Sequence, residues 1–350
     1  MFETSYYGPT AWHPERDSSP RHRGQLDQRS RGFRFQWEAG QKLSKEYVPN
    51  MVPGDFLETW LPGQDEDTNW YVEEGRGEER KRVPMAWINQ ESIRWATLPG
   101  SSWRWLLLKV FAKFTLILGG VGIFLASVAV TLLLDVSAEE KRQLFQEGFL
   151  PIVVYGGGGC ALIWGGVSLI EHLFPSWIYK APKGPLWEFN RRTGLVTAFR
   201  NPKRKRDAGQ IAWQSPFADF DGYVHTGPTH QGLPLYYGAM VHRFREEALP
   251  LTDFQAASSN DEDHKALWNF WLQYMDSTAP LPDIPLFEKH RANDPTTAAH
   301  DRRTGRPERY WRDMDDATWD AQLKQNLARV NAYDIPGRLN LMDRHVRYAD

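Results

Sequence analysis

Two long uncharged runs dominate the distribution of apolar residues along the chain. Phe114–Leu134 and Phe149–Ile170 contain no ionised side chain, and the short linker Asp135–Gly148 joins them. A helix rises about 1.5 Å per residue, so each run is long enough to cross the roughly 30 Å hydrocarbon core of a bilayer. The pattern predicts a transmembrane helical hairpin at 103–174, with antiparallel spans at about 110–134 and 149–171.

Polar and aromatic patterns divide the remainder into further segments. Residues 1–32 are polar and rich in Arg, Ser and Pro, which predicts a flexible tail. Residues 33–102 alternate aromatic clusters with Pro-Gly and acidic turns, and we expect short cytoplasmic strands that pack on another part of the chain. Residues 288–350 form a polar tail with one amphipathic helix at about 311–330, which we expect to dock on another element or a partner.

Residues 186–287 have the pattern of a folded domain. Trp187–Phe199 reads as strand, turn and strand around Thr193-Gly194, and more strand-like segments follow. A helix at 260–276 has an apolar stripe that includes Leu267, Phe270 and Trp271. The predicted fold class is therefore an α+β membrane protein, in which the hairpin precedes a β-rich cytoplasmic domain closed by an amphipathic helix.

Aromatic and basic residues gather at the ends of the predicted spans. Trp103 and Trp105 precede the first span and Trp177 follows the second, as expected of amphipathic rings at a membrane interface. Lys109 and Lys113 are four residues apart, so they share a helix face from which their long side chains can reach lipid phosphates. The predicted role of these residues is anchoring at the interface.

Small residues recur at intervals of four within both spans. This spacing lets helix backbones approach closely, and it has two interpretations: packing within the hairpin, or self-association with another copy or a partner helix. The run of four glycines also predicts a kink near Tyr155–Cys160. The small residues in question are Gly122, Ala126, Gly157, Ala161 and Gly165.

Basic residues are concentrated in the two flanks of the hairpin. The linker has only Lys141 and Arg142, and its acidic residues outnumber them. The positive-inside rule then predicts a multi-pass membrane protein with both termini in the cytoplasm and the linker outside, which in a bacterial inner membrane is a short periplasmic loop.

Composition and motifs argue against most catalytic classes. The formal net charge of −2 indicates no nucleic-acid partner, and the one cysteine lies inside the second apolar run. No nucleotide-binding, zinc-protease or nucleophile-elbow motif is present, so we expect no catalytic residue, metal or cofactor. An alternative cluster, whose spacing matches no standard metal site, consists of Asp219, Asp221, His225 and His230.

A basic loop follows the predicted strand pair. On the cytoplasmic side it can bind anionic lipid, at about 1 kcal/mol per basic residue near the surface. The alternative is a solvated loop that only enforces topology. The loop consists of Lys203, Arg204, Lys205 and Arg206.

Several short motifs carry a resemblance to known families. Phe189–Val196, Ala212-Trp213, Ala266–Met275 and Pro280–Pro282 resemble a family of unknown function, whose members are bacterial two-span membrane proteins often encoded near type VI secretion and toxin genes. The order of spans, a strand carrying F-N-R-x-T-G, a basic loop and a Trp-containing strand is also similar to membrane-attached pleckstrin-homology-like domains of bacteria.

The resemblance implies a non-enzymatic accessory or immunity protein that binds a toxin or secretion component. The expected partners are membrane lipids and that protein, with homo-oligomerisation possible. The alternatives are a secreted effector that inserts into membranes, a lipid-binding pleckstrin-homology-like module and an enzyme that uses the Asp/His cluster. Toxicity on expression without a partner would distinguish an effector from an immunity protein.

Overall fold

The chain forms two compact units, which we call the hairpin unit and the β-rich unit. The hairpin unit comprises Tyr71–Met85 and Ala96–Lys183, and the β-rich unit comprises Met1–Trp70, Ala86–Trp95 and Gly184–Asp350. The computed structural model describes residues 6–15, 40–58, 71–74, 81–84, 86–96, 100–133, 137–178, 180, 184–200, 209–229, 231–243, 245 and 247–333.

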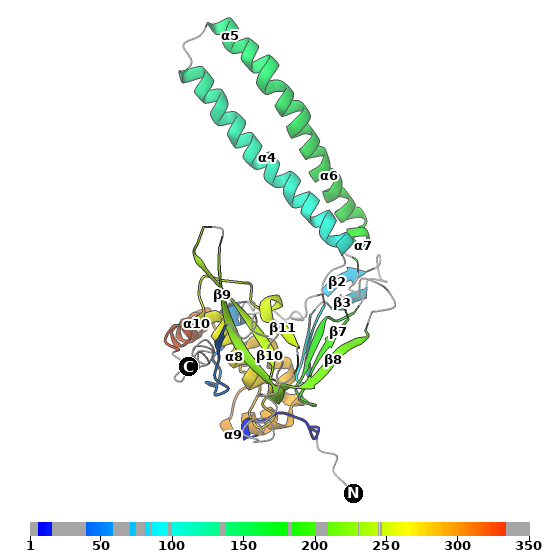
Figure 1. Ribbon diagram of the computed structural model, residues 1–350, viewed down its shortest axis with the longest axis vertical. Coiled ribbons are helices and arrows are strands. Elements are labelled where there is room, and N and C mark those ends of the chain that lie inside the picture. The colour runs from blue at the N-terminus through cyan, green and yellow to red at the C-terminus, as the bar shows by residue number, and fades with distance from the viewer. Residues whose placement is uncertain are drawn as a thin grey trace, which may run out of the picture. The chain divides into compact units, whose positions relative to one another are not determined.

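The hairpin unit confirms the predicted helical hairpin. Helices α4 and α6 run side by side in opposite directions (Figure 1). The second arm is helical from Ala138 to Leu173. A small antiparallel strand pair also belongs to this unit. Its elements are β2 (Tyr71–Glu74), β3 (Lys81–Pro84), α4 (Gly100–Leu133), α5 (Ala138–Gln143), the π-helical segments η4 (Leu144–Phe149) and η5 (Ile152–Gly157), α6 (Gly158–Leu173) and α7 (Pro175–Ile178).

Local sequence explains how the second arm begins and where it is distorted. Ser137 and Glu140 form a capping box, in which each side chain bonds the other's backbone N–H group. The predicted kink at Tyr155–Cys160 overlaps η5, which leads into the glycine run. Glycine has little helix propensity, and a π-helical turn is a common way for a helix to accommodate a weak segment.

The β-rich unit contains two antiparallel sheets. The first has the order β4-β5-β6-β7-β8 and the second the order β1-β9-β10-β11. The first sheet consists of β4 (Ala86–Ile88), β5 (Ser92–Trp95), β6 (Trp187–Asn190), β7 (Leu195–Phe199) and β8 (Ile211–Pro216). The second consists of β1 (Gln41–Lys42), β9 (Phe220–Pro228), β10 (Pro234–His242) and β11 (Ala248–Pro250).

Helices complete the β-rich unit. The predicted helix at 260–276 is confirmed as α8, and nearly every residue of it is buried. The predicted helix at 311–330 begins later, as α10, because Asp315 caps its N-terminus by accepting from Thr318 N. The helices are α3 (Asp55–Glu58), α8 (Glu262–Met275), α9 (Pro295–Thr304), α10 (Asp316–Asn331) and the 3-10 segments η7 (Phe217–Asp219), η8 (Leu251–Asp253) and η9 (Pro285–Asn293).

Aromatic side chains from α8 and both sheets build the core. Trp271 stacks on Phe189 of β6 with ring centroids 3.9 Å apart, and Phe254 lies 4.2 Å from Trp187. The closing helix therefore buries its apolar stripe, as the spacing predicts, and part of that stripe packs against β6, where the F-N-R-x-T-G motif begins.

The N-terminal tail prediction is wrong for residues 6–15, which we call the N-terminal strap. Trp12 is only 1% exposed, and its carbonyl accepts from the Ser277 N–H group at 3.0 Å. The strap also crosses the β6–β7 turn, where Thr10 Oγ1 donates to the Thr193 carbonyl at 2.6 Å. A Cβ on Gly194, whose φ is +71°, would lie 2.1 Å from the Thr10 carbonyl oxygen, so the turn requires glycine.

The predicted boundaries of the segments outside the hairpin also change. Strands β1, β4 and β5 come from 33–102, and they pair with strands of 186–287. This confirms that strands from 33–102 pack on another part of the chain. The C-terminal limit of 287 is too early, since Trp311, within the predicted polar tail, is 4% exposed and belongs to the same core.

Along the sequence, the hairpin lies between β5 and β6, two strands that pair with each other in the first sheet. Trp95, at the end of β5, lies opposite Trp187, at the start of β6, and their rings stack 6.3 Å apart. The chain thus leaves the sheet at Trp95 and returns to it at the adjacent position. Both flanks of the hairpin therefore belong on one side of any membrane that it crosses.

Candidate functional site

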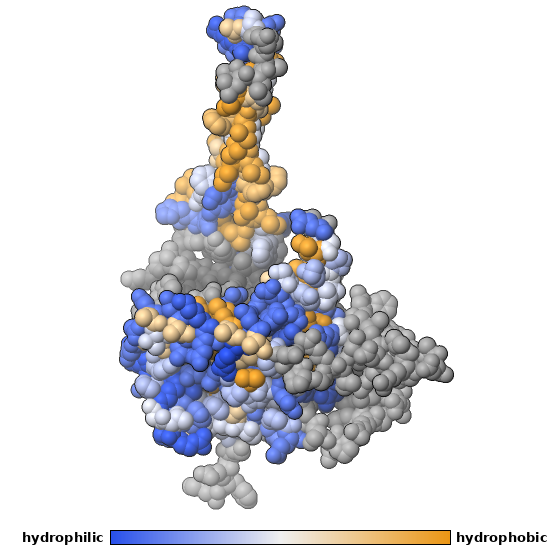
Figure 2. All heavy atoms as spheres, turned by 90° about the vertical axis from the view of Figure 1, so that its left-hand side faces the viewer, coloured by the Kyte–Doolittle hydropathy of each residue, from blue (hydrophilic) through white to orange (hydrophobic). Residues whose placement is uncertain are grey.

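The outer surface of the hairpin is apolar. Phe111 is 68% exposed, Phe124 66% and Leu162 78%. On the face seen in Figure 2, apolar residues cover the hairpin along most of its length, and polar residues gather at its tip. Both arms are long and apolar enough to cross a membrane. A helix pair that folds in water buries its apolar stripe instead.

The predicted interface residues lie at the start of α4 and in α7. Trp103 and Trp177 are exposed, whereas Trp105 is half-buried. Lys113 is exposed. The Lys109 ammonium forms an ion pair with the Glu171 carboxylate of α6. The two lysines thus differ, because Lys109 has a partner across the hairpin, at the boundary of both apolar runs.

Removal of one member of the Lys109–Glu171 pair is expected to destabilise the hairpin. Glu171→Gln leaves the ammonium without its counter-ion at a boundary where water is scarce, at a cost of roughly 1 kcal/mol for a partly exposed pair. Lys109→Met/Glu171→Leu removes both charges and should restore stability. Thermal unfolding of the full chain in detergent micelles, followed by helical circular dichroism, measures both effects.

Lys113→Met is the matched control, because Lys113 lies one turn further along α4 and is exposed. It should leave the unfolding temperature unchanged. A double variant as unstable as Glu171→Gln would contradict the assignment of an ion pair.

The glycines of the two long apolar helices face open space in the hairpin. A Cβ on Gly122, Gly157 or Gly165 would meet no atom within 4 Å beyond the neighbouring turns. Ala112 and Val167 are instead among the most buried apolar residues of this unit, at 2% and 4% exposure. The contacts between α4 and α6 therefore do not use these glycines, and self-association through them stays a prediction.

Asp221, from the candidate Asp/His cluster, is committed to cations. Its carboxylate lies 2.7 Å from Lys42 Nζ, 2.7 Å from an Arg243 nitrogen and 3.9 Å from Lys45 Nζ. Burial raises the pKa of Asp221, but Lys45, Arg243 and Lys42 lower it by more, and the pKa lies well below the usual range. This carboxylate, on β9, joins β9 to the neighbouring strand β1 through Lys42.

The other members of that cluster do not converge on a common site. His225 is 4% exposed and stacks on Tyr237 at 5.2 Å, whereas Asp219 lies 3.9 Å from His242. His230 and the basic loop Lys203–Arg206 lie outside the described residues. Among the residues that the structure describes, no group of three or more His, Cys, Asp or Glu side chains is placed to hold a metal ion.

Burial of His225 predicts a loss of stability on acidification. Burial lowers the pKa of His225 from 6.5 to about 4 in the native state. Below pH 6.5 the unfolded chain binds a proton that native His225 does not, so stability falls as the pH decreases from 7 to 5. The expected contribution is about 1 kcal/mol after partial solvent screening is allowed for. Denaturant unfolding of the full chain at the two pH values should show a smaller pH effect for His225→Phe than for the parent, and an equal effect in both proteins would contradict this role of His225.

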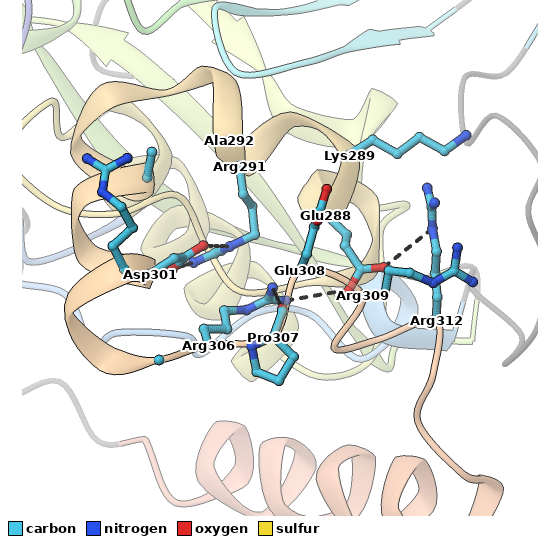
Figure 3. Close-up of a pocket in the computed structure, with 13 residues that line it drawn as sticks. Glu288, Lys289, Arg291, Ala292, Asp301, Arg306, Pro307, Glu308, Arg309 and Arg312 are labelled. Atoms are coloured by element: carbon cyan, nitrogen blue, oxygen red, sulfur yellow. Dashed lines mark hydrogen bonds and ion pairs between the residues drawn. The ribbon is translucent and has the colours of Figure 1, made fainter.

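A pocket of about 430 Å³ lies between η9, α9 and residues 305–312 (Figure 3). Two buried arginines form part of its wall, and each is held by a bidentate carboxylate. Arg291 donates to both Asp301 oxygens at 2.7 Å, and Arg306 donates to both Asp283 oxygens at 2.9 and 2.8 Å. Paired in this way, the two guanidinium groups give the pocket a fixed shape.

Glu288 lies against the same pocket. Its side chain is 4% exposed, and it accepts from Trp311 N at 2.6 Å and lies 3.4 Å from Arg312 Nε and 3.7 Å from Arg306. Burial raises the pKa of Glu288 by more than the Trp311 N–H group and the two arginines lower it. A buried carboxylate among arginines in a pocket is typical of binding sites and also of structural ion-pair networks.

The sequence analysis missed this pocket. An available signal was the arginine at every third position within the predicted polar tail, at Arg303, Arg306, Arg309 and Arg312. The fold brings three of these arginines to the lining and leaves Arg303 outside it.

Comparison of the chain with protein-family models, curated proteins and solved structures gave no match. The two resemblances therefore stay expectations.

Proposed function

We propose that this chain is a non-enzymatic integral membrane protein that presents its β-rich unit to a protein partner on the cytoplasmic side of a bacterial inner membrane. The observation that carries the proposal is the outward apolar surface of the hairpin, which connects two paired strands of the first sheet. A lipid bilayer is the environment in which such a surface is stable.

The dimensions of the hairpin support a membrane anchor. The part of α4 from Phe114 to Leu133 has no charged residue and is about 30 Å long, which matches the hydrocarbon core. The polar helix α5 and its cap, at Ser137–Gln143, then lie beyond the core, and Trp103 and Trp177 are at the opposite interface.

The connection of the hairpin to the sheet supports the orientation. Because Trp95 and Trp187 are paired, both flanks share one side of the membrane. These flanks carry more basic residues than the linker, which favours the cytoplasm for the β-rich unit.

The partner is proposed from the family resemblance, as a toxin or a secretion component for which this chain is an accessory or immunity protein. The order of elements in the β-rich unit, two antiparallel sheets followed by α8, also supports the comparison with pleckstrin-homology-like domains. Neither of the two family resemblances supplies a catalytic residue, in keeping with a binding role.

Affinity capture of the full chain from native membranes in mild detergent, with bound proteins identified by mass spectrometry, tests the proposed role. We expect a toxin or secretion component among them, and we expect cells that express the chain alone to grow normally and to resist that toxin. Toxicity of the chain in cells that lack the partner would overturn this role and favour a membrane-inserting effector.

A further inference from the structure

Positive charge is in excess on the lining of the pocket between η9, α9 and residues 305–312. Six of its side chains are cationic and three are acidic. Asp283 and Asp313 lie outside the lining and pair with Arg306 and Arg309, and even with these two included one positive charge remains in excess. The cationic residues are Lys289, Arg291, Arg302, Arg306, Arg309 and Arg312, and the acidic ones are Glu288, Asp301 and Glu308.

Five of the six cations of the lining fall into two groups. Arg291 and Arg306 are almost fully buried in bidentate pairs and act as fixed walls. Lys289, Arg309 and Arg312 extend toward the same side of the pocket (Figure 3). The pair of Arg309 with Asp313 is more than half exposed on both sides, so it is weak and an incoming anion can displace it.

Size and lining define the class of ligand. A volume of about 430 Å³ falls within the range of small-molecule sites and exceeds the needs of a bare inorganic anion. Ala292, Ala298 and Pro307 provide apolar surface beside the cations. The planar guanidinium group matches the oxygens of a phosphoryl group in a two-bond geometry, and lysine adds a point charge.

We propose that this pocket binds the phosphoryl group of a small phosphorylated molecule or of a lipid headgroup, with Lys289 and Arg309 at the mouth and Arg312 deeper as its ligands. This site would bind a phosphorylated ligand and not the protein partner, and the ligand would not be chemically changed.

Titration of the full chain in detergent micelles tests the site, with pyrophosphate and short-chain phosphatidic acid as separate probes in an isothermal calorimeter. Lys289→Ala/Arg309→Ala removes two exposed cations and leaves the core intact. Loss of charge-assisted hydrogen bonds from both side chains should weaken binding at least ten-fold. Arg303→Ala is the matched control, because Arg303 is exposed on the same helix as Arg302 but does not line the pocket.

Each outcome decides the question. Pyrophosphate binding that weakens in the double variant and persists in Arg303→Ala supports the site with a soluble phosphate as its ligand. The same pattern with phosphatidic acid alone supports it with a lipid headgroup. Absence of binding to both probes, or equal binding by the double variant and the parent, would overturn the proposal.

Discussion

Replacement of the chain between Ala96 and Gly184 by a short glycine-containing turn is expected to move the protein from the membrane fraction to the soluble fraction. The core of the β-rich unit consists of residues from that unit itself. The junction is short as well, since Leu186 N donates to the Trp95 carbonyl at 2.7 Å. Ultracentrifugation of lysates measures the shift, and near-ultraviolet circular dichroism reports whether the aromatic core is retained.

The control for this excision is replacement of only Ala138–Gln143 by a glycine-serine segment, which leaves both apolar runs intact. That variant should stay entirely in the membrane fraction. A shortened protein that is folded and still sediments with membranes would show that the hairpin is not the anchor.

Asp294→Ala is expected to cause the largest loss of stability of any single substitution considered. Asp294 and Arg191 are both fully buried and lie 3.3 Å apart. Removal of the carboxylate leaves a buried guanidinium without a counter-ion, which costs about 3–5 kcal/mol. The variant also loses the N-cap of α9 at Thr297 and the acceptor of the Tyr7 hydroxyl. Thermal unfolding of the full chain should show a decrease of roughly 6–20 °C.

Asp315→Ala is the matched control for this substitution. Asp315 caps α10 in the same way, but it is exposed and has no buried cation to neutralise. It should have a much smaller effect. Similar losses for the two variants would mean that capping, and not the buried ion pair, accounts for the role of Asp294.

The residues within a segment were sufficient to predict the elements that depend on their own sequence. The two long apolar helices followed from long runs without charge, and α8 followed from its aromatic stripe, because the spacing of apolar residues within one segment is enough to indicate a helix. The turn between β6 and β7 followed from Thr193-Gly194, because a tight turn is indicated by its own residues.

Contacts between segments that are distant in the sequence could not be predicted from such patterns. The pairing of β5 with β6 spans the whole hairpin, and Trp12 is buried within a segment whose composition is polar. The arginine pocket likewise depends on η9 and α9, where short turns and many charges give no periodic signal. The composition of a segment does not show which distant segments pack against it, and that packing decides which of its residues are buried.

Labelling of single cysteines with a membrane-impermeant maleimide tests the central claim most directly. Cys160 is the only cysteine, so Cys160→Ser provides a clean background for Glu139→Cys in the linker and Gln231→Cys in the β-rich unit. In intact spheroplasts the account predicts labelling at position 139 and protection at position 231 until the membrane is permeabilised. Labelling at both positions, or at position 231 alone, in intact spheroplasts would contradict a hairpin that crosses the membrane with both flanks in the cytoplasm.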